Sequence, residues 1–398
     1  MKLVVLVLAV LLAVAACICR FAPGYYAFLL GLIAVTALVG IGLNILYGLV
    51  GEVSLGQAGF LALGAYGVAI LTTKAGLDFW AALPLAIIFV AAISAALSVP
   101  ALRVTGPYLA MVTIAFGFIV ESASIEWADL TGGSSGIANV PAPFTTNGMA
   151  MLTCVFAAIA VVGFYQVARS PLGLAMRAVA SAPAAARGIG IGPLPVRAAA
   201  FVLAAACAGL AGGLLAALTG FVAPSSFPFS QSILFLLAVV VGGAGRTWGP
   251  VIGAAIVGLL PELLAGLAEY RLLVFGAGLL VVLWLAPGGV AGLLEIFRKA
   301  YRDRCGEIDA APALAFLEGR GSGLQARDLR VAFGGVVAVR DVRLDAPAGR
   351  ITSLIGPNGA GKTTLLNLAS GFQRADSGAV HIGNVDVTSL PAHQVARA

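Results

Sequence analysis

The sequence predicts a polytopic α-helical membrane bundle of about eight to ten transmembrane helices, followed by a short α/β domain with a P-loop. Three observations lead to this fold class. The chain has 398 residues, of which 61% are hydrophobic and 10% are charged, well below the roughly 25% charged residues of soluble domains. Eighteen of the charged residues lie in 1–297 and 22 lie in 298–398. Finally, GPNGAGKT at 356–363 has the G-x-x-x-x-G-K-T spacing of a phosphate-binding loop.

Apolar runs that approach the roughly 20 residues needed to cross a bilayer occupy most of residues 1–297. The predicted spans are 3–19, 25–49, 56–73, 80–100, 107–127, 149–168, 197–221, 231–244, 249–267 and 271–287. The eighth and ninth are short and share the break VVGGAGRTWGP, so they are either two spans or a re-entrant pair. The first is either an uncleaved helix, which we favour, or a secretory signal in which VAAC at Cys17 resembles a lipoprotein cleavage site.

Arg and Lys in the loops predict the orientation of the bundle, because such residues are enriched on the cytoplasmic side. With the N-terminus inside, the inner loops hold Lys2, Arg103, Arg169, Arg177, Arg187, Arg197 and Arg246, and the outer loops hold Arg20, Lys74 and Arg271. Ten spans then place the P-loop in the cytoplasm, where ATP is. We therefore predict a multi-pass protein with a cytoplasmic C-terminal domain.

Glycine spacing predicts close helix crossings within the bundle. Gly245, Gly249 and Gly253 are four residues apart and are expected on one helix face, and Gly209 and Gly213 repeat the spacing. Small residues at this spacing let helix backbones approach closely in a membrane.

Acidic residues gather near the predicted outer ends of spans, namely Glu121, Glu126, Asp129, Glu262 and Glu269. They are either solvated interfacial charges, which we favour, or an acidic outer mouth that meets a polar solute. The absence of a buried run of Asp, Glu or His argues against an ion-coupled carrier. The cysteines lack metal-ligand spacing, and no cluster of basic and aromatic residues predicts a nucleic-acid partner.

The longest inner loop, 168–197, alternates arginines and prolines with Ala-rich stretches. We expect short cytoplasmic helices that either dock a partner domain or form a plain positive-inside connector. The predicted domains are a membrane domain over 1–297, a linker over 298–322 and an α/β domain over 323–398. Within the last we expect strands at 324–335, 336–349, 350–356 and 377–387, and a helix at 363–371.

The P-loop residues predict a nucleotide site. The glycines let the backbone bend around phosphates, Lys362 is expected to reach the β- and γ-phosphates, and the Thr363 hydroxyl is expected to ligate Mg²⁺. Phe333 ends a strand and either stacks on adenine or is buried in the core. The cofactors are then ATP and Mg²⁺, with Thr363 as the metal ligand. The predicted binding residues are Phe333, Gly356, Pro357, Asn358, Gly359, Ala360, Gly361, Lys362, Thr363 and Thr364.

Longer stretches resemble a known family. FGGVVAVRDVRL, SLIGPNGAGKTTLLNLASG and SGAVHIGNVDVTSLPAHQVAR are similar to the first third of an ABC transporter ATPase domain, most closely the ATPases of branched-chain amino acid importers. LNILYGLVGEVSLGQAGFLALGAYGVAIL, GPYLAMVTIAFGFIVE, TGGSSGI, SPLGLAMRAVASAPAAARGIGI and GGAGRTWGPVIGA are similar to that family's permease subunit. The resemblance covers nearly the whole chain.

The resemblance implies a permease of an ATP-driven importer for branched-chain or other hydrophobic amino acids in the bacterial inner membrane. It implies a second permease subunit, an ABC ATPase subunit and a periplasmic substrate-binding protein as partners. It also favours adenine stacking for Phe333, and it makes 168–197 the coupling segment that an ATPase grips. Related permeases carry simple sugars, urea or amides, so these solutes are the alternative.

The same resemblance implies that the ATPase domain is partial. The family's ATPase domains are much longer than 323–398, and the glutamine loop, signature motif, aspartate–glutamate site and switch histidine are not found here. We therefore expect an incomplete or truncated product, we predict no catalytic residue, and whether the chain hydrolyses ATP stays open. The other possibility is a non-hydrolysing membrane pathway or binding module. The reading frame beyond residue 398 would distinguish the two.

Overall fold

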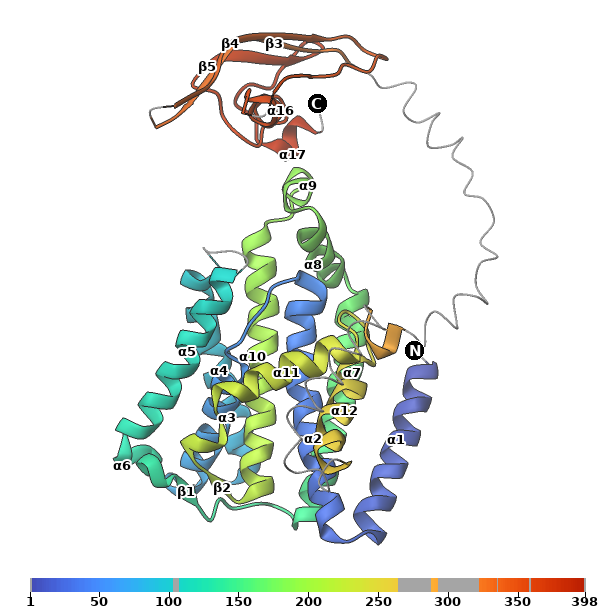
Figure 1. Ribbon diagram of the computed structural model, residues 1–398, viewed down its shortest axis with the longest axis vertical. Coiled ribbons are helices and arrows are strands. Elements are labelled where there is room, and N and C mark those ends of the chain that lie inside the picture. Colours follow the sequence, from blue (N-terminus) through green and yellow to red (C-terminus); the bar gives the residue numbers. More distant parts are fainter. Residues whose placement is uncertain are drawn as a thin grey trace. The chain divides into compact units, whose positions relative to one another are not determined.

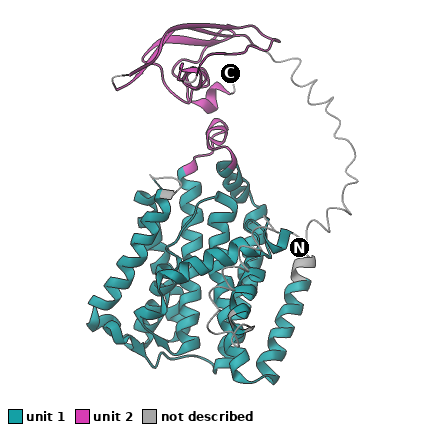
Figure 2. Cartoon of the chain, viewed as in Figure 1, with its two compact units in different colours: residues 1–180, 194–301 teal, residues 181–193, 302–398 magenta. Residues whose placement is uncertain are grey.

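A computed structural model describes residues 2–102, 107–263, 288–292, 322–334, 336–357 and 359–396. The chain divides into two compact units (Figure 2). Residues 1–180 and 194–301 form the membrane unit, and residues 181–193 and 302–398 form the P-loop unit. The tenth predicted span, all of the predicted linker except its last residue, and Asn358 lie outside the described residues.

Apolar helices dominate the membrane unit (Figure 1), and those in the described residues overlap the first nine predicted spans. They are α1 (Lys2–Phe21), α2 (Gly24–Leu43), α3 (Gln57–Thr73), α4 (Phe79–Ala101), α5 (Pro107–Glu126), α7 (Thr146–Arg169), α10 (Pro193–Thr219), α11 (Phe229–Gly242) and α12 (Gly249–Leu263). In the described part of the chain, six helices are long and apolar enough to cross a membrane, with α11 counted from Pro224. The prediction of a polytopic helical bundle is confirmed.

Short elements connect these helices. They are the π-helical turn η1 (Asn44–Val50), α6 (Ala128–Thr131), η2 (Gly133–Ser135), β1 (Ile137–Ala138), α8 (Pro171–Ser181), β2 (Phe221–Val222) and η3 (Pro224–Ser226). Strands β1 and β2 pair antiparallel, and Figure 1 shows them at the same end of the bundle as α6. Helix α4 begins where the Asp78 carboxylate accepts a hydrogen bond from the Trp80 N–H at 3.1 Å, a typical N-cap.

The side chain of Asn44 joins the end of α2 to the break between α11 and α12. Its Nδ2 donates to the Arg246 carbonyl at 3.0 Å, and its Oδ1 accepts from the Gly245 N–H at 2.7 Å. Asn44 is fully buried, so both polar ends of the amide are satisfied by backbone groups. Gly48, one turn later, lies so close to Gly245 that a Cβ there would collide with the Gly245 nitrogen. These contacts fix the 243–248 turn against α2.

Glycines let the backbones of α3 and α10 meet directly. A Cβ at Gly64 would collide with the carbonyl oxygen of Gly209, and a Cβ at Gly212 would collide with the carbonyl oxygen of Leu61. A Cβ at Gly213 would lie 2.6 Å from the side chain of Leu83 on α4. The close crossings predicted from Gly209 and Gly213 are confirmed.

The glycine prediction for the ninth span is partly wrong. Gly249 and Gly253 lie in α12, and a Cβ on either would collide with a backbone carbonyl, that of Gly243 or Ala238. Gly245 precedes the helix and has φ +75°, a left-handed conformation within the turn that follows Gly243, the C-cap of α11. It therefore does not share a helix face with the other two.

The P-loop unit contains one antiparallel sheet and the helices α16 (Lys362–Ala369), α17 (Ala392–Val395) and α9 (Pro183–Gly188). The strands are β3 (Leu324–Phe333), β4 (Val336–Ala346), β5 (Ser377–Ile382) and β6 (Val385–Asp386), in the order β4-β3-β5-β6. Side chains from three of these strands and both C-terminal helices share one core, which includes Leu329, Val339, Leu365, Val380 and Val395. The predicted hairpin, helix and final strand are confirmed.

The predicted strand at 350–356 is wrong, because these residues form no regular structure. Ile351 is 98% exposed and Ile355 is 91% exposed, although both were expected to be buried. A strand is stable when a neighbouring strand pairs with its N–H and C=O groups. No described strand of the sheet pairs with this segment.

We expect Gly212→Ala to destabilise the membrane unit by about 1–3 kcal/mol, because the new methyl collides with the α3 backbone. Gly163→Ala on α7 is the matched control, since its methyl meets no atom within 4 Å. The control should be neutral or stabilising by up to about 1 kcal/mol, from helix propensity alone. Chemical unfolding of the purified protein in detergent micelles measures both. Equal effects of the two substitutions would contradict the close crossing.

Candidate functional site

The predicted P-loop is an exposed loop that ends at the start of α16. Gly359 has φ +85° and Gly361 has φ +78°, conformations that residues with a side chain rarely adopt. A Cβ at Gly361 would collide with the carbonyl oxygen of Ala338, so this glycine also lets the loop approach β4. These two glycines thus allow the backbone curvature that was predicted for phosphate binding.

Lys362 is the first residue of α16, and its side chain folds back over the loop. The Nζ donates hydrogen bonds to the carbonyl oxygens of Gly356 at 2.7 Å and Pro357 at 2.6 Å. The ammonium therefore lies against the loop backbone, and its contact with phosphate oxygens stays a prediction. Leu365 and Leu368 anchor the helix in the core, which holds the loop at the edge of the unit.

The metal prediction rests on Thr363, which is exposed on the first turn of α16. In the described ranges no cluster of three or more His, Cys, Asp or Glu could hold a metal ion. If a Mg²⁺ ion arrived with a nucleotide, the Thr363 hydroxyl would be the protein group that holds it. The exposed hydroxyl fits that role.

Phe333 ends β3, and its side chain is 51% exposed. It is thus not the buried core residue that one interpretation of the sequence expected. An exposed aromatic ring beside a nucleotide loop suits adenine stacking, which stays a prediction. Within the described chain no ring contact or hydrogen bond joins Phe333 to the loop.

The segment 181–193 belongs to the P-loop unit although it lies in the longest predicted inner loop (Figure 2). Helix α9 packs against α17, and a Cβ at Gly188 would lie 3.6 Å from the Phe372 ring. The structure confirms the expected short helices in this loop, α8 and α9. Of the two interpretations of the loop, this contact favours docking.

Glu52 and Arg197 form an ion pair that the sequence did not reveal, with Arg197 Nε 3.2 Å from Glu52 Oε1. Glu52 lies between η1 and α3 and is 6% exposed, and Arg197 lies in the first turns of α10. Arg197 Nε also lacks an aligned hydrogen bond, so the contact is ionic. Burial raises the pKa of the Glu52 carboxyl, and the Arg197 charge opposes that rise. The clue in the sequence was an isolated Glu between two apolar spans, but a partner so distant along the chain cannot be assigned from spacing.

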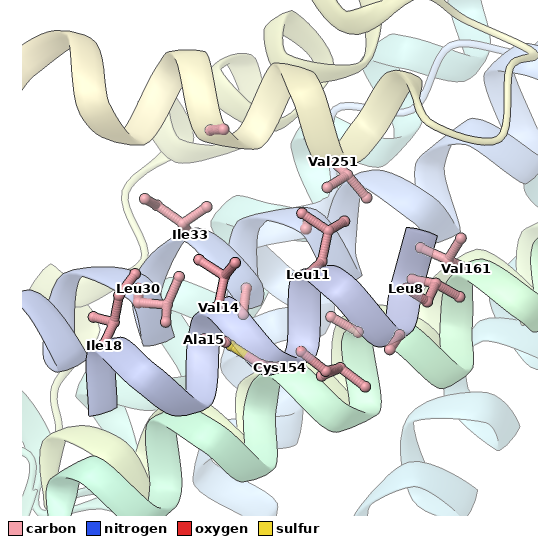
Figure 3. Close-up of a pocket in the computed structure, with 16 residues that line it drawn as sticks. Leu8, Leu11, Val14, Ala15, Ile18, Leu30, Ile33, Cys154, Val161 and Val251 are labelled. Carbon is pink, nitrogen blue, oxygen red and sulfur yellow. The ribbon is translucent and has the colours of Figure 1, made fainter. Parts of the chain in front are cut away.

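An apolar pocket of the membrane unit lies between α1, α2, α7 and α12 and has a volume of about 220 Å³. Figure 3 shows Leu11, Val14, Ile33 and Val161 pointing into it. Its lining is aliphatic apart from the thiol of Cys154. A pocket with these walls has no polar group that could orient an amino acid, so it is not a candidate solute site.

The comparison with known proteins decides the family of the membrane unit. A family model described as the permease component of branched-chain amino acid transport systems matches residues 25–283. The high-affinity branched-chain amino acid permease protein LivM of Salmonella typhimurium is 33% identical over 306 residues, which cover 69% of this chain and 71% of that protein. The chain belongs to this permease family. The resemblance stated from the sequence is confirmed.

The P-loop unit of the permease matches a second family model, described as ABC transporter, over residues 339–398. The probable branched-chain amino acid ATP-binding protein LivG of Archaeoglobus fulgidus is 45% identical over 74 residues, 19% of this chain and 29% of that protein. The sulfate/thiosulfate import ATP-binding protein CysA of Burkholderia mallei is 46% identical over 72 residues, 18% of this chain and 20% of that protein. This unit therefore identifies an ABC-type ATP-binding fragment but does not discriminate between solutes.

We expect Glu52→Gln to destabilise the permease by roughly 3 kcal/mol, because it leaves the Arg197 guanidinium, 17% exposed, without its counter-charge. Replacing both residues by apolar ones, Glu52→Leu with Arg197→Met, should recover most of that loss. Chemical unfolding in micelles measures the three variants.

The control is Asp328→Asn, which breaks the exposed pair with Arg343 in the P-loop unit. The Arg343 guanidinium lowers the pKa of the Asp328 carboxyl, but solvent screens this pair, so no measurable loss is expected. If Glu52→Gln proved as harmless as Asp328→Asn, the buried pair would have no structural role.

Proposed function

We propose that this permease moves branched-chain or other hydrophobic amino acids inward across a bacterial inner membrane, powered by ATP. The observation that supports it most is the match of the membrane unit to LivM over most of both chains. A multi-component ABC importer is the setting of this family. The specific partners we propose are a second permease subunit, an ABC ATPase subunit and a periplasmic substrate-binding protein.

We further propose that the P-loop unit lies in the cytoplasm and binds Mg-ATP. The exposed loop offers backbone N–H groups and the N-terminus of α16 to phosphates. Lys362 would exchange its carbonyl partners, Gly356 and Pro357, for phosphate oxygens, which are stronger acceptors for an ammonium. Phe333 would stack on the adenine. Bound Mg²⁺ neutralises phosphate charge, and Thr363 would be its protein ligand.

The contact of α9 with α17 and Phe372 supports a coupling role for the 168–197 loop. Arg187 and the prolines 183 and 193 frame a short helix that an ATP-binding domain can grip, so that movement of the domain is transmitted to α10. The arginine-rich composition of the same loop supports its cytoplasmic placement.

Uptake of labelled L-leucine tests the proposed function. Proteoliposomes that contain the permease with its partner subunits and binding protein should accumulate leucine when ATP is enclosed, and excess valine or isoleucine should compete. Ribose and urea should not compete. Vesicles that lack this chain are the control. Accumulation of a sugar or urea in place of leucine would assign the permease to a related importer instead.

Binding of a fluorescent ATP analogue to the purified permease tests the P-loop. Lys362→Ala should weaken binding by roughly tenfold or more, because it removes charge-assisted hydrogen bonds to the phosphates. Arg340→Ala on β4 is the control, since it removes one exposed positive charge that does not belong to the loop. Equal affinity of the two variants would show that the loop does not hold the phosphates.

A further inference from the structure

Two adjoining hollows lie between α3, α5 and the turn from η3 to α11. Each has a cavity volume of about 10 Å³, enough for one water-sized group such as an ammonium. Gly59, Gly117, Glu121 and Phe227 line both of them. They are therefore parts of one site, with a carboxylate at their junction.

We propose that Glu121 and Tyr66 form a binding site for the ammonium group of an amino-acid substrate within the permease. The site rests on the proposed function and extends it, because it names residues of this chain that contact the solute.

Tyr66 supplies the observation that points to a ligand. Its side chain lines the hollow, the residue is 4% exposed, and its hydroxyl has no hydrogen-bond partner in the described residues. Buried hydroxyls are almost always paired, because an unpaired one loses its hydrogen bonds to water without replacement. A bound polar group in the hollow would supply the missing partner.

Glu121 lies on α5, one turn after Gly117, and is partly buried. In the part of the chain that the structure describes, no hydrogen bond or ion pair satisfies its carboxylate. Lys74, at the end of α3, instead donates to the carbonyl oxygen of Asp129. Ser124, the other hydroxyl beside Glu121, donates to the carbonyl of Val120 at 2.7 Å. The carboxylate is thus left with its acceptor capacity unused.

The side chains that line the two hollows favour a positively charged ligand. A carboxylate only accepts hydrogen bonds, and it repels anions such as sulfate. The Tyr66 and Phe227 rings, with centroids 6.3 Å apart, present aromatic surfaces that favour a cation and offer little to a sugar hydroxyl. Phe118 and Phe229, with centroids 6.0 Å apart, add apolar surface for a hydrophobic side chain. An ammonium attached to an aliphatic chain satisfies all of these groups.

Glycine keeps the site open. A Cβ at Gly117 would meet no atom within 4 Å, although α5 packs against α3 at this point. At Gly59, on the facing helix, a Cβ would lie 3.2 Å from the Gly117 Cα. The empty space at Gly117 lies on the same face of α5 as Glu121, because residues four apart in a helix are neighbours. Gly117→Val should therefore fill the site without a clash that prevents folding.

The direct test measures binding to the purified full chain by equilibrium dialysis. The probes are 3-methylbutylamine, which is leucine without its carboxylate, and 4-methylpentanoate, which is leucine without its amino group. We expect the amine to bind and the carboxylate not to bind. Glu121→Gln and Gly117→Val should each weaken amine binding by tenfold or more, and Tyr66→Phe should weaken it severalfold. Glu126→Gln, which changes an exposed carboxylate farther along the same helix, should bind like the wild type.

Stability separates a binding role from a structural one. Tyr66→Phe should leave the unfolding midpoint unchanged or raise it, because the hydroxyl that it removes has no partner. A lowered midpoint with unchanged amine binding would overturn the proposal. So would failure of the wild type to bind the amine, or equal binding of 4-methylpentanoate. Leucine uptake by the assembled importer tests the proposed function separately. If the chain bound the amine but the importer carried some other solute, the proposed function would be refuted. Glu121 and Tyr66 would still form an ammonium-binding site.

Discussion

Direct contact between helix backbones is the constraint on which the membrane unit depends. Lipid is as apolar as a leucine side chain, so burial of hydrocarbon cannot by itself hold helices together in a bilayer. The crossing of α3 and α10 relies instead on Gly64 and Gly212, where each added methyl would collide with a backbone atom. Helix α3 in turn forms one wall of the hollow at Tyr66, with α5 on its other side. A change in the crossing would therefore alter the shape of the proposed site.

The sequence predicted the helices well because the bilayer fixes the length of an apolar run. It also placed Gly209 and Gly213 in close crossings, since the spacing of small residues along one helix is enough to predict such a crossing. The ion pair of Glu52 with Arg197 could not be predicted, because it joins residues that the fold alone brings together. The position of Tyr66 beside a hollow could not be predicted for the same reason. An aromatic residue in an apolar span has no visible role until its neighbours are known.

Errors in the prediction share one physical cause. A strand at 350–356 and a helical position for Gly245 were each inferred from composition along the chain. Whether these residues form a strand or a helix depends on neighbours that are distant in the sequence. The segment at 350–356 has no neighbouring strand among β3 to β6. Gly245 is held in a turn by a hydrogen bond to Asn44. For the P-loop, in contrast, the local glycine pattern was sufficient to predict that the backbone bends at Gly359 and Gly361. The burial of Phe333 depends on packing, and the sequence left it undecided.

The bidentate use of Asn44 limits which residues can replace it. The amide presents a donor and an acceptor side by side, and each meets one backbone group of the turn at 245–246. Aspartate would set a negative charge against the Arg246 carbonyl, and leucine would leave both backbone groups without partners. Glutamine carries the same groups one methylene farther out, where Gly48 and Gly245 leave no spare room. In related permeases that keep this turn, variation at this position should be narrow.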